Sequence, residues 1–188
     1  MKGKRYILAL VLLPCYIAEV KAQTLAIKSD LLTGALSSPN LAVEMKLSER
    51  LTLEAGLHYN PFPAGSGKRW KHWFLQPELR YWMCRPWGGH FFGAHLIYGV
   101  YNVGNIKLPL GLLKPVRSAR YEGELMGVGV AYGYNFILSP RWSLETSVGV
   151  GLVHTTNERY RGTDYVGSGS GNAIVPTRMA VSLVYLLK

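Results

Sequence analysis

Apolar and polar residues alternate strictly in several long segments of this chain. The alternation is clearest in 51–59, 126–136, 142–152 and 179–187, where apolar or aromatic side chains occupy nearly every second position. In 142–152 the intervening positions hold only serine, glutamate and glycine. A period of two residues is that of a β-strand with two different faces, whereas an amphipathic helix repeats every 3.6 residues. The pattern therefore predicts an all-β protein.

Eight segments of this kind can be marked along the chain. The predicted strands are 24–33, 39–47, 51–59, 70–83, 90–101, 121–136, 141–153 and 174–187. The connections at 48–50, 84–89 and 139–140 are short, those at 60–69, 102–120 and 154–173 are long, and the first loop, 34–38, is also short. Short turns at one end and long loops at the other are typical of outer-membrane barrels. We therefore predict an eight-stranded antiparallel up-and-down transmembrane β-barrel.

The polar faces of these strands indicate which side of the sheet points into the barrel. They carry small residues and isolated charges, which is typical of the crowded interior of a small membrane barrel with its apolar face turned to lipid. A soluble β-sandwich or a periplasmic lipocalin-like binding barrel shows the same alternation with the apolar face inside, and this alternative stays open. Strand length favours the membrane barrel, because a tilted strand needs roughly 9–11 residues to cross a bilayer and soluble strands usually have about 5–6.

The interior of an eight-stranded barrel is just wide enough to be filled by side chains, so its charges should neutralise one another and leave no transport pore. The polar residues predicted to point inward are Lys28, Asp30, Glu44, Lys46, Glu54, His58, His72, Gln76, Glu78, Arg80, His95, Glu145 and Arg178. Pro77 lies within a predicted strand and cannot donate a ladder hydrogen bond, which predicts a bulge or a register shift beside it.

Aromatic residues gather near both ends of the predicted strands. Tryptophan and tyrosine form girdles at membrane interfaces, because their rings are apolar and their tips are polar. One predicted ring comprises Tyr81, Trp82, Trp87, Trp142 and Tyr185, and the other comprises Tyr59, Trp70, Trp73, Tyr101 and Tyr121.

Composition agrees with an exported, folded domain. The chain has 188 residues, of which 48% are hydrophobic, 12% aromatic and 17% charged, and this excludes a disordered protein.

Residues 1–22 have a basic start, an uncharged stretch and small residues before the expected cut, and they predict a cleaved signal peptide. A membrane anchor is the alternative, but the uncharged stretch is shorter than the ~20 residues that a spanning helix needs. The barrel domain then comprises residues 23–188, with Cys84 as its sole cysteine, so neither an internal disulfide nor a thiolate metal cluster can form.

The formal net charge of +10 suggests an acidic partner. An exported protein rarely meets nucleic acid, so we expect outer-membrane lipids and lipopolysaccharide instead. The predicted binding residues are cations of the long loops, facing lipopolysaccharide phosphates: Lys68, Arg69, Lys107, Lys114, Arg117, Arg120, Arg159 and Arg161.

Catalytic chemistry has weaker support in the sequence. An outer-membrane enzyme that modifies lipid A, either a deacylase or an acyltransferase, could use His58 or His72 near the long-loop rim, with Ser66 between them. No acid is placed in the sequence to orient either histidine, so the arrangement is incomplete. The glycine–serine run at 167–171 lacks the lysine and the helix of a phosphate loop. We therefore predict a non-enzymatic protein without metal or cofactor.

Several motifs together resemble a known family. They are 70–73, 76–82, 89–91, 101–104, 121–123 and 133–134. Their combination resembles a family of exported Bacteroides-type proteins that is catalogued as a domain of unknown function, with an OmpX/OmpA-like plan, over about residues 28–188. The resemblance implies a small outer-membrane barrel of the cell envelope, inserted by the outer-membrane insertion machinery, and in some genomes an association with fimbrial or other surface proteins. It implies no established activity.

Overall fold

The computed structural model describes residues 24–35, 38–62, 69–104, 120–161 and 164–187, so the predicted signal peptide lies outside the described residues. The described chain forms eight strands and one short helix. They are β1 (Leu25–Asp30), α2 (Leu31–Ala35), β2 (Asn40–Lys46), β3 (Leu51–Asn60), β4 (Arg69–Trp82), β5 (Gly89–Gly104), β6 (Arg120–Ile137), β7 (Trp142–Arg161) and β8 (Asp164–Leu187).

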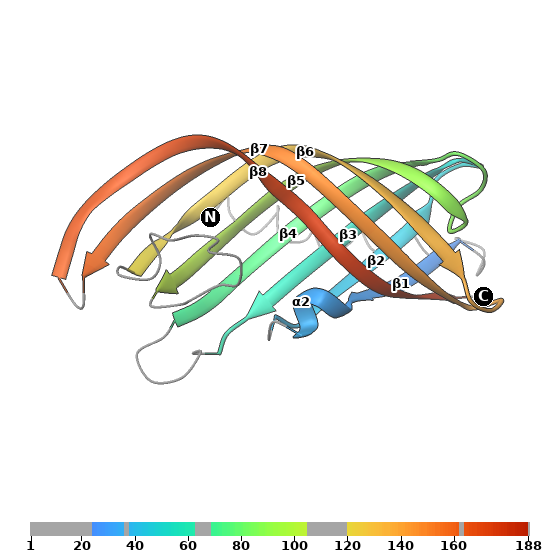
Figure 1. Ribbon diagram of the computed structural model, residues 1–188, viewed down its shortest axis with the longest axis horizontal. Coiled ribbons are helices and arrows are strands. Elements are labelled where there is room, and N and C mark those ends of the chain that lie inside the picture. The colour runs from blue at the N-terminus through green and yellow to red at the C-terminus, as the bar shows by residue number, and fades with distance from the viewer. Residues whose placement is uncertain (1–23, 36–37, 63–68, 105–119, 162–163, 188) are drawn as a thin grey trace, which may run out of the picture.

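Each strand pairs antiparallel with the next strand in the chain, and β1 pairs with β8, so the sheet closes into a barrel. This confirms the predicted all-β architecture of eight up-and-down strands. The three tight turns β2–β3, β4–β5 and β6–β7 lie at one end of the barrel together with the C-terminus, on the right of Figure 1. No helix in the described part of the chain is long and apolar enough to cross a membrane.

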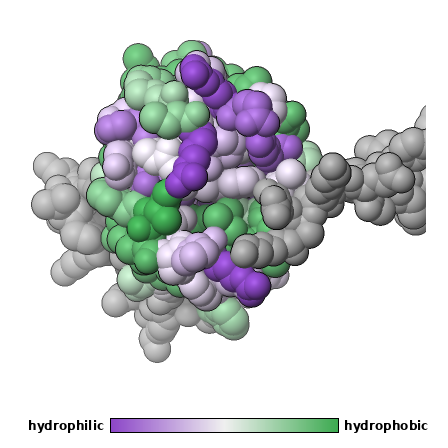
Figure 2. Space-filling view, turned by 90° about the vertical axis from the view of Figure 1, so that its right-hand side faces the viewer, coloured by the Kyte–Doolittle hydropathy of each residue, from purple (hydrophilic) through white to green (hydrophobic). Residues whose placement is uncertain are grey.

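The two faces of the sheet differ as the alternation predicts, with charges inside and large apolar side chains outside. In β7, the inward residues Ser143 and Glu145 are buried, whereas the outward Val148 is 58% exposed. Most of the polar residues predicted to point inward are buried, including Lys28, Glu44 and Arg80. Viewed from the short-turn end, hydrophilic residues form patches over the end and hydrophobic residues lie along much of its margin (Figure 2).

Strands β7 and β8 are much longer than the sequence pattern predicts. The segment 154–173 was expected to be a long loop, but the two strands continue as a paired hairpin as far as Arg161 and Asp164. They extend well past the rest of the barrel on the left of Figure 1. The loop prediction is therefore wrong for most of this segment. Of the other two predicted long loops, residues 63–68 and 105–119 lie outside the described residues.

Strand β1 is shorter than predicted. It ends at Asp30 instead of continuing to residue 33, and α2 follows directly. The Asp30 carboxylate accepts hydrogen bonds from the backbone N–H groups of Leu32 and Thr33 at 3.0 and 3.4 Å, which caps the helix. Because β1 stops at the Asp30–Ser182 pair, the earlier part of β8 has no β1 partner along that edge.

Pro77 does not disturb the register. The pairs Leu75–Tyr98 and Glu78–His95, on either side of it, belong to the same register, so the predicted shift is wrong. The β7–β8 ladder has two register shifts, one near the end of the hairpin at Arg159–Tyr160 and one where Pro176 pairs with Val150 and Arg178 with Gly149. The second lies beside a proline. Thr177 is the extra residue of this bulge, and a bulge is where a strand tolerates proline.

The first predicted aromatic ring is only partly correct. Trp82 and Trp87 are buried inside the barrel, because Trp82 lies in phase with the inward residues of β4. Tyr81 and Trp142 are exposed on the outer surface, and the Trp142 ring packs against Tyr185 with centroids 4.8 Å apart.

The second ring is also divided between the two faces. Tyr59 is exposed on the outside, and Trp73 packs against the exposed Tyr98 with ring centroids 5.5 Å apart. The remaining members line an interior cavity instead of the outer surface: Trp70, Tyr101 and Tyr121.

Candidate functional site

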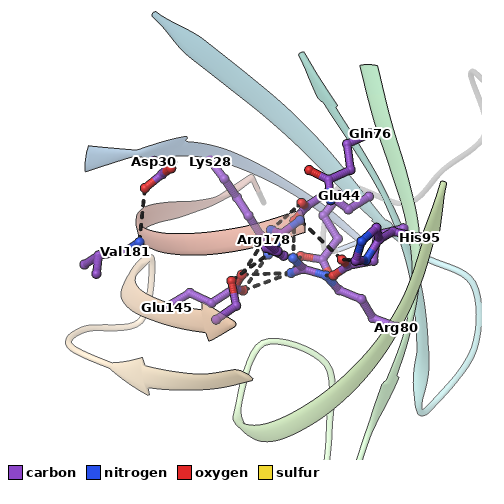
Figure 3. Close-up of polar contacts among 12 residues, drawn as sticks. Lys28, Asp30, Glu44, Gln76, Arg80, His95, Glu145, Arg178 and Val181 are labelled. Atoms are coloured by element: carbon purple, nitrogen blue, oxygen red, sulfur yellow. Dashed lines mark hydrogen bonds and ion pairs between the residues drawn. The ribbon is translucent and has the colours of Figure 1, made fainter. Parts of the chain in front are cut away.

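The middle of the barrel is filled by a charged cluster around Arg80. The Arg80 side chain is 0% exposed, and its guanidinium contacts four carboxylates, one from its own strand β4 and one each from β2, β3 and β7. These partners are Glu78 (Nε–Oε1, 2.7 Å), Glu54 (Nη2–Oε2, 2.8 Å), Glu145 (Nη1–Oε1, 3.0 Å) and Glu44 (Nη1–Oε2, 3.3 Å). Figure 3 shows the side chains converging from different strands.

Lys28 and Arg178 complete the cluster. Lys28 Nζ forms ion pairs with Glu44, with Glu145 at 2.6 Å and with Glu54 at 3.1 Å. Arg178 pairs with Glu54 at 2.8 Å and with Glu78 at 3.3 Å. Every cation therefore has several carboxylate partners, which is what a buried charge requires. The interior charges therefore form a packed network of ion pairs, as predicted, but the carboxylates outnumber the cations.

Glycines on the inner face provide the space for these large side chains. A Cβ at Gly93 would lie 2.7 Å from the Glu78 carboxylate, and one at Gly129 would lie 2.4 Å from His95 Nε2. One at Gly149 would lie 3.0 Å from Arg178 Cβ. Each of these glycines thus makes room for a large side chain of the neighbouring strand: Glu78 of β4, His95 of β5 or Arg178 of β8.

An aromatic plug closes the barrel below the charged cluster, at the short-turn end. Trp82 and Phe91 are fully buried there with ring centroids 4.7 Å apart, and Ala26 and Val184 pack with them. The Trp82 indole donates a 2.9 Å hydrogen bond to Thr52 Oγ1. The plug and the charged cluster together fill this half of the lumen.

A cavity of about 730 Å³ occupies the other half of the lumen. Its floor includes Lys28, Glu54 and Arg178 from the charged cluster. Its walls are mainly apolar and aromatic, and they include Phe74, Ile97, Tyr101, Val103, Tyr121 and Leu125. The volume lies within the range of about 300–1,000 Å³ that is typical of small-molecule sites.

His72 and Ser38 form a polar pair on the cavity wall. Ser38 Oγ lies 3.1 Å from His72 Nε2, and both residues are buried. The Trp70 indole donates to Ser38 Oγ at 3.3 Å. Sequence analysis missed Ser38, because it belongs to a short connection with no motif around it. Ser66, the serine considered there, lies outside the described residues.

His58 lines the same cavity but takes no part in this pair. It is half-buried, and its ring makes no hydrogen bond to another residue in the described part of the chain. The two histidines named in the sequence therefore share one cavity, and only His72 has a hydroxyl beside it.

The predicted loop cations are only partly described. Arg120 forms an ion pair with Glu122, and its guanidinium lies 5.0 Å from the centre of the Tyr160 ring. Arg159 is exposed on the long hairpin, and Arg161 pairs in register with Asp164. Lys68, Lys107, Lys114 and Arg117 lie outside the described residues. Arg69 begins β4, but its side chain is not described.

Metal binding finds no support in the described ranges. They contain no group of three histidine, cysteine or acidic side chains that could hold a metal ion. Cys84 is a free, exposed cysteine in the β4–β5 turn.

Comparison with known proteins gives the family and nothing more specific. No curated protein and no solved structure matches the chain. The model of the family described as "Protein of unknown function (DUF3575)" matches residues 7–187. Since this match covers nearly the whole sequence, the chain belongs to the DUF3575 family.

Proposed function

We propose that this protein is a small, non-enzymatic outer-membrane β-barrel with a structural or surface-interaction role through its long-loop end. The observation that carries the proposal is the distribution of side chains. Charged residues are buried in the lumen, while large apolar residues such as Val130, Leu152 and Ile174 are exposed on the outer face. A soluble binding barrel has the opposite arrangement, because its apolar residues form an internal core.

The height of the apolar band supports a bilayer as its surroundings. Val128, Leu152 and Ile174 form one row across β6, β7 and β8. The next outward row towards the long-loop end consists of Met126, His154 and Asn172. Two of these three residues are polar, and Met126 is the exception. Three strands thus change from apolar to polar at nearly the same level. In β7 the outward positions from Trp142 to Leu152 are apolar apart from Thr146, and this length is close to the roughly 9–11 residues that a tilted strand needs to cross a bilayer.

Fractionation of cells that express the full chain tests this proposal first. We expect the protein in the outer-membrane fraction, recovered only with detergent, and migrating differently on gels before and after heating. Recovery in the soluble periplasmic fraction without detergent would refute the proposal and favour a lipocalin-like binding barrel.

Lipopolysaccharide is the partner that we propose for the long-loop end. Replacing the eight predicted loop cations with glutamine should weaken binding of the purified barrel to lipopolysaccharide vesicles. The matched control replaces Arg50 and Arg141, which lie in turns at the opposite end and hydrogen-bond Tyr81 and Tyr185. Equal binding by the two variants would exclude a specific role of the loop cations.

One observation favours a second candidate function, an outer-membrane hydrolase that acts on lipid A. The pair Ser38–His72 lies on the wall of an apolar cavity, with Oγ 3.1 Å from Nε2. In such a reaction Ser38 Oγ attacks the ester carbonyl and His72 takes its proton, then returns it to the leaving alcohol. Water subsequently hydrolyses the acyl-serine to a free acid.

Mass spectrometry of lipid A tests the hydrolase. Expression of the wild type should remove one acyl chain, and Ser38→Ala and His72→Ala should abolish that change. His58→Ala is the control, because none of the described hydroxyl groups lies beside its ring. Unchanged lipid A in cells that express the wild type would eliminate this candidate.

A further inference from the structure

The wall of the cavity includes the part of β8 that has no β1 neighbour. Met179 of β8 lines the cavity and is 65% exposed on the outer surface. It lies before Ser182, the first residue of β8 that pairs with β1. At this point the cavity therefore lies next to an edge of the sheet.

The topology explains this edge. β1 pairs with β8 only up to Asp30–Ser182, and β8 has no β1 partner before Ser182. The short helix α2 follows β1 at this point, has no buried residue and contacts β8. Asp30 secures the end of β1 to β8, since its carboxylate accepts a 3.1 Å hydrogen bond from the Val181 N–H (Figure 3). Above that contact, the exposed helix α2 stands beside β8 in the place of a strand.

The charge of the floor restricts what can bind. Lys28 and Arg178 line the cavity, but each already contacts several carboxylates. Among the described residues, the buried charges of the lumen are the three cations Lys28, Arg80 and Arg178 and the five carboxylates of Asp30, Glu44, Glu54, Glu78 and Glu145. An anionic group would have to displace these carboxylates, so the cavity disfavours it.

From these observations we infer that the cavity binds a single hydrocarbon chain of an amphiphile with an uncharged head group, which enters from the bilayer between α2 and β8. The apolar wall of Phe74, Ile97 and Leu125 takes the chain. His58, whose ring has no hydrogen-bond partner in the described ranges, is available to a hydroxyl head. This inference rests on the proposed membrane location.

Photo-crosslinking in nanodiscs tests the inference. The probe is a fatty alcohol with a diazirine on its chain, and adducts on the wild type are located by peptide mass spectrometry. We expect saturable adducts at the inward Ile97 and Leu125, and non-saturable adducts from surrounding lipid at the outward Leu96 and Met126. Adducts at outward residues alone would overturn the inference and leave a cavity filled by water.

A matched pair of variants on β3 strengthens the test. Gly56 faces the cavity, and a Cβ there would make only ordinary contacts of 3.7 Å, so Gly56→Phe fills the cavity without a clash at the backbone. Ala55→Phe adds the same ring to the outward face. Inward labelling should fall about tenfold or more in G56F, which is roughly 1.4 kcal/mol of binding free energy, and persist in A55F. Equal inward labelling in the two variants, each verified as folded by its gel migration, would refute the site.

Two further arms test the head group and the route. The fatty acid of the same chain length should label Ile97 and Leu125 at least about tenfold less than the alcohol; equal labelling would refute the charge argument.

Met179→Trp should slow inward labelling from the bilayer without changing its final extent, and an unchanged rate would refute lateral entry. Because fractionation reads the membrane location separately, a soluble protein would refute the proposed function, while crosslinking in solution would still test the cavity.

Discussion

Arg80 shows how single residues hold this barrel together. Its guanidinium is fully buried and contacts four glutamates, which also contact Lys28 or Arg178. A buried carboxylate without a cation is costly, so each glutamate depends on the same few cations. The structural role of Arg80 is therefore to balance carboxylates contributed by several strands.

Removing the charge of Arg80 should destabilise the barrel much more than the small change in side-chain volume suggests. Arg80→Met keeps most of the side-chain volume but leaves four carboxylates to two cations, and we expect a loss of about 3–5 kcal/mol of unfolding free energy. Denaturant titration of the detergent-solubilised barrel, followed by gel migration, measures it. The control Arg141→Met removes an exposed arginine, for which we expect a change within about 0.5 kcal/mol. Similar midpoints for the two variants would contradict the proposed role of Arg80.

Inward glycines should also be sensitive to substitution. A Cβ at Gly133 would lie 2.4 Å from the Phe91 ring and 2.6 Å from the Thr146 carbonyl oxygen. Gly133→Ala should therefore lower the unfolding free energy by about 1–3 kcal/mol through overpacking. Gly56→Ala, on the same face but with ordinary contacts of 3.7 Å, is the matched control and should change stability little. The same denaturant titration compares them, and equal losses would show that space beside Phe91 is not limiting.

The inward position of Arg80 and its partners could be predicted from the sequence, but their pairing could not. A period of two residues assigns a face to each side chain. It carries no information about contacts across the lumen, such as Arg80 with Glu145. Trp82 illustrates the same rule, because its phase with Arg80 indicates the interior, whereas its place beside a turn suggested the outer ring. Phase was the better guide.

At the scale of elements, β7 and β8 show where the alternation stops being informative. From Trp142 to Leu152 the two faces of β7 differ, because the residues that face the lumen are small or charged and the outward residues are mostly apolar. Beyond it, the outward residues His154, Thr156 and Glu158 are polar like their neighbours, and the facing part of β8 is rich in glycine and serine. Backbone pairing continues, but the contrast between faces disappears. The sequence therefore predicts a loop where the structure has a hairpin.

This boundary gives a prediction about the outer face of β7. In the proposed bilayer, Val148→Arg lies near the middle of the apolar band and should cost about 2–4 kcal/mol, whereas Thr156→Arg lies beyond it and should cost about 0–1 kcal/mol. Reversible unfolding in lipid vesicles measures both. Equal costs at the two positions would mean that no apolar medium surrounds Val148, and this would contradict the membrane location independently of fractionation.

On the scale of the whole molecule, the lumen has three layers: the aromatic plug, the charged cluster and the cavity. The sequence predicts a filled lumen from strand number alone, since eight strands leave little interior space. It could not predict that only half of the lumen is filled. That depends on where glycines face large side chains, and on β1 ending at Asp30 so that α2 replaces part of the wall.

The unequal ends of the barrel should also differ in local stability. In β8, residues 182–185 pair with both β1 and β7, whereas residues 167–174 pair with β7 alone. Along a strand with one neighbour, about half of the N–H groups lack a partner in the ladder, because successive groups point to opposite sides. Hydrogen exchange of the folded barrel, followed by mass spectrometry, should therefore show fast exchange for about half of the amides in 167–174 and slow exchange throughout 182–185. The lower part of β7, which has neighbours on both sides, is the internal reference for full protection. Uniform protection along β8 would mean that another segment covers its upper edge, and the proposed lateral route into the cavity would then be closed as well.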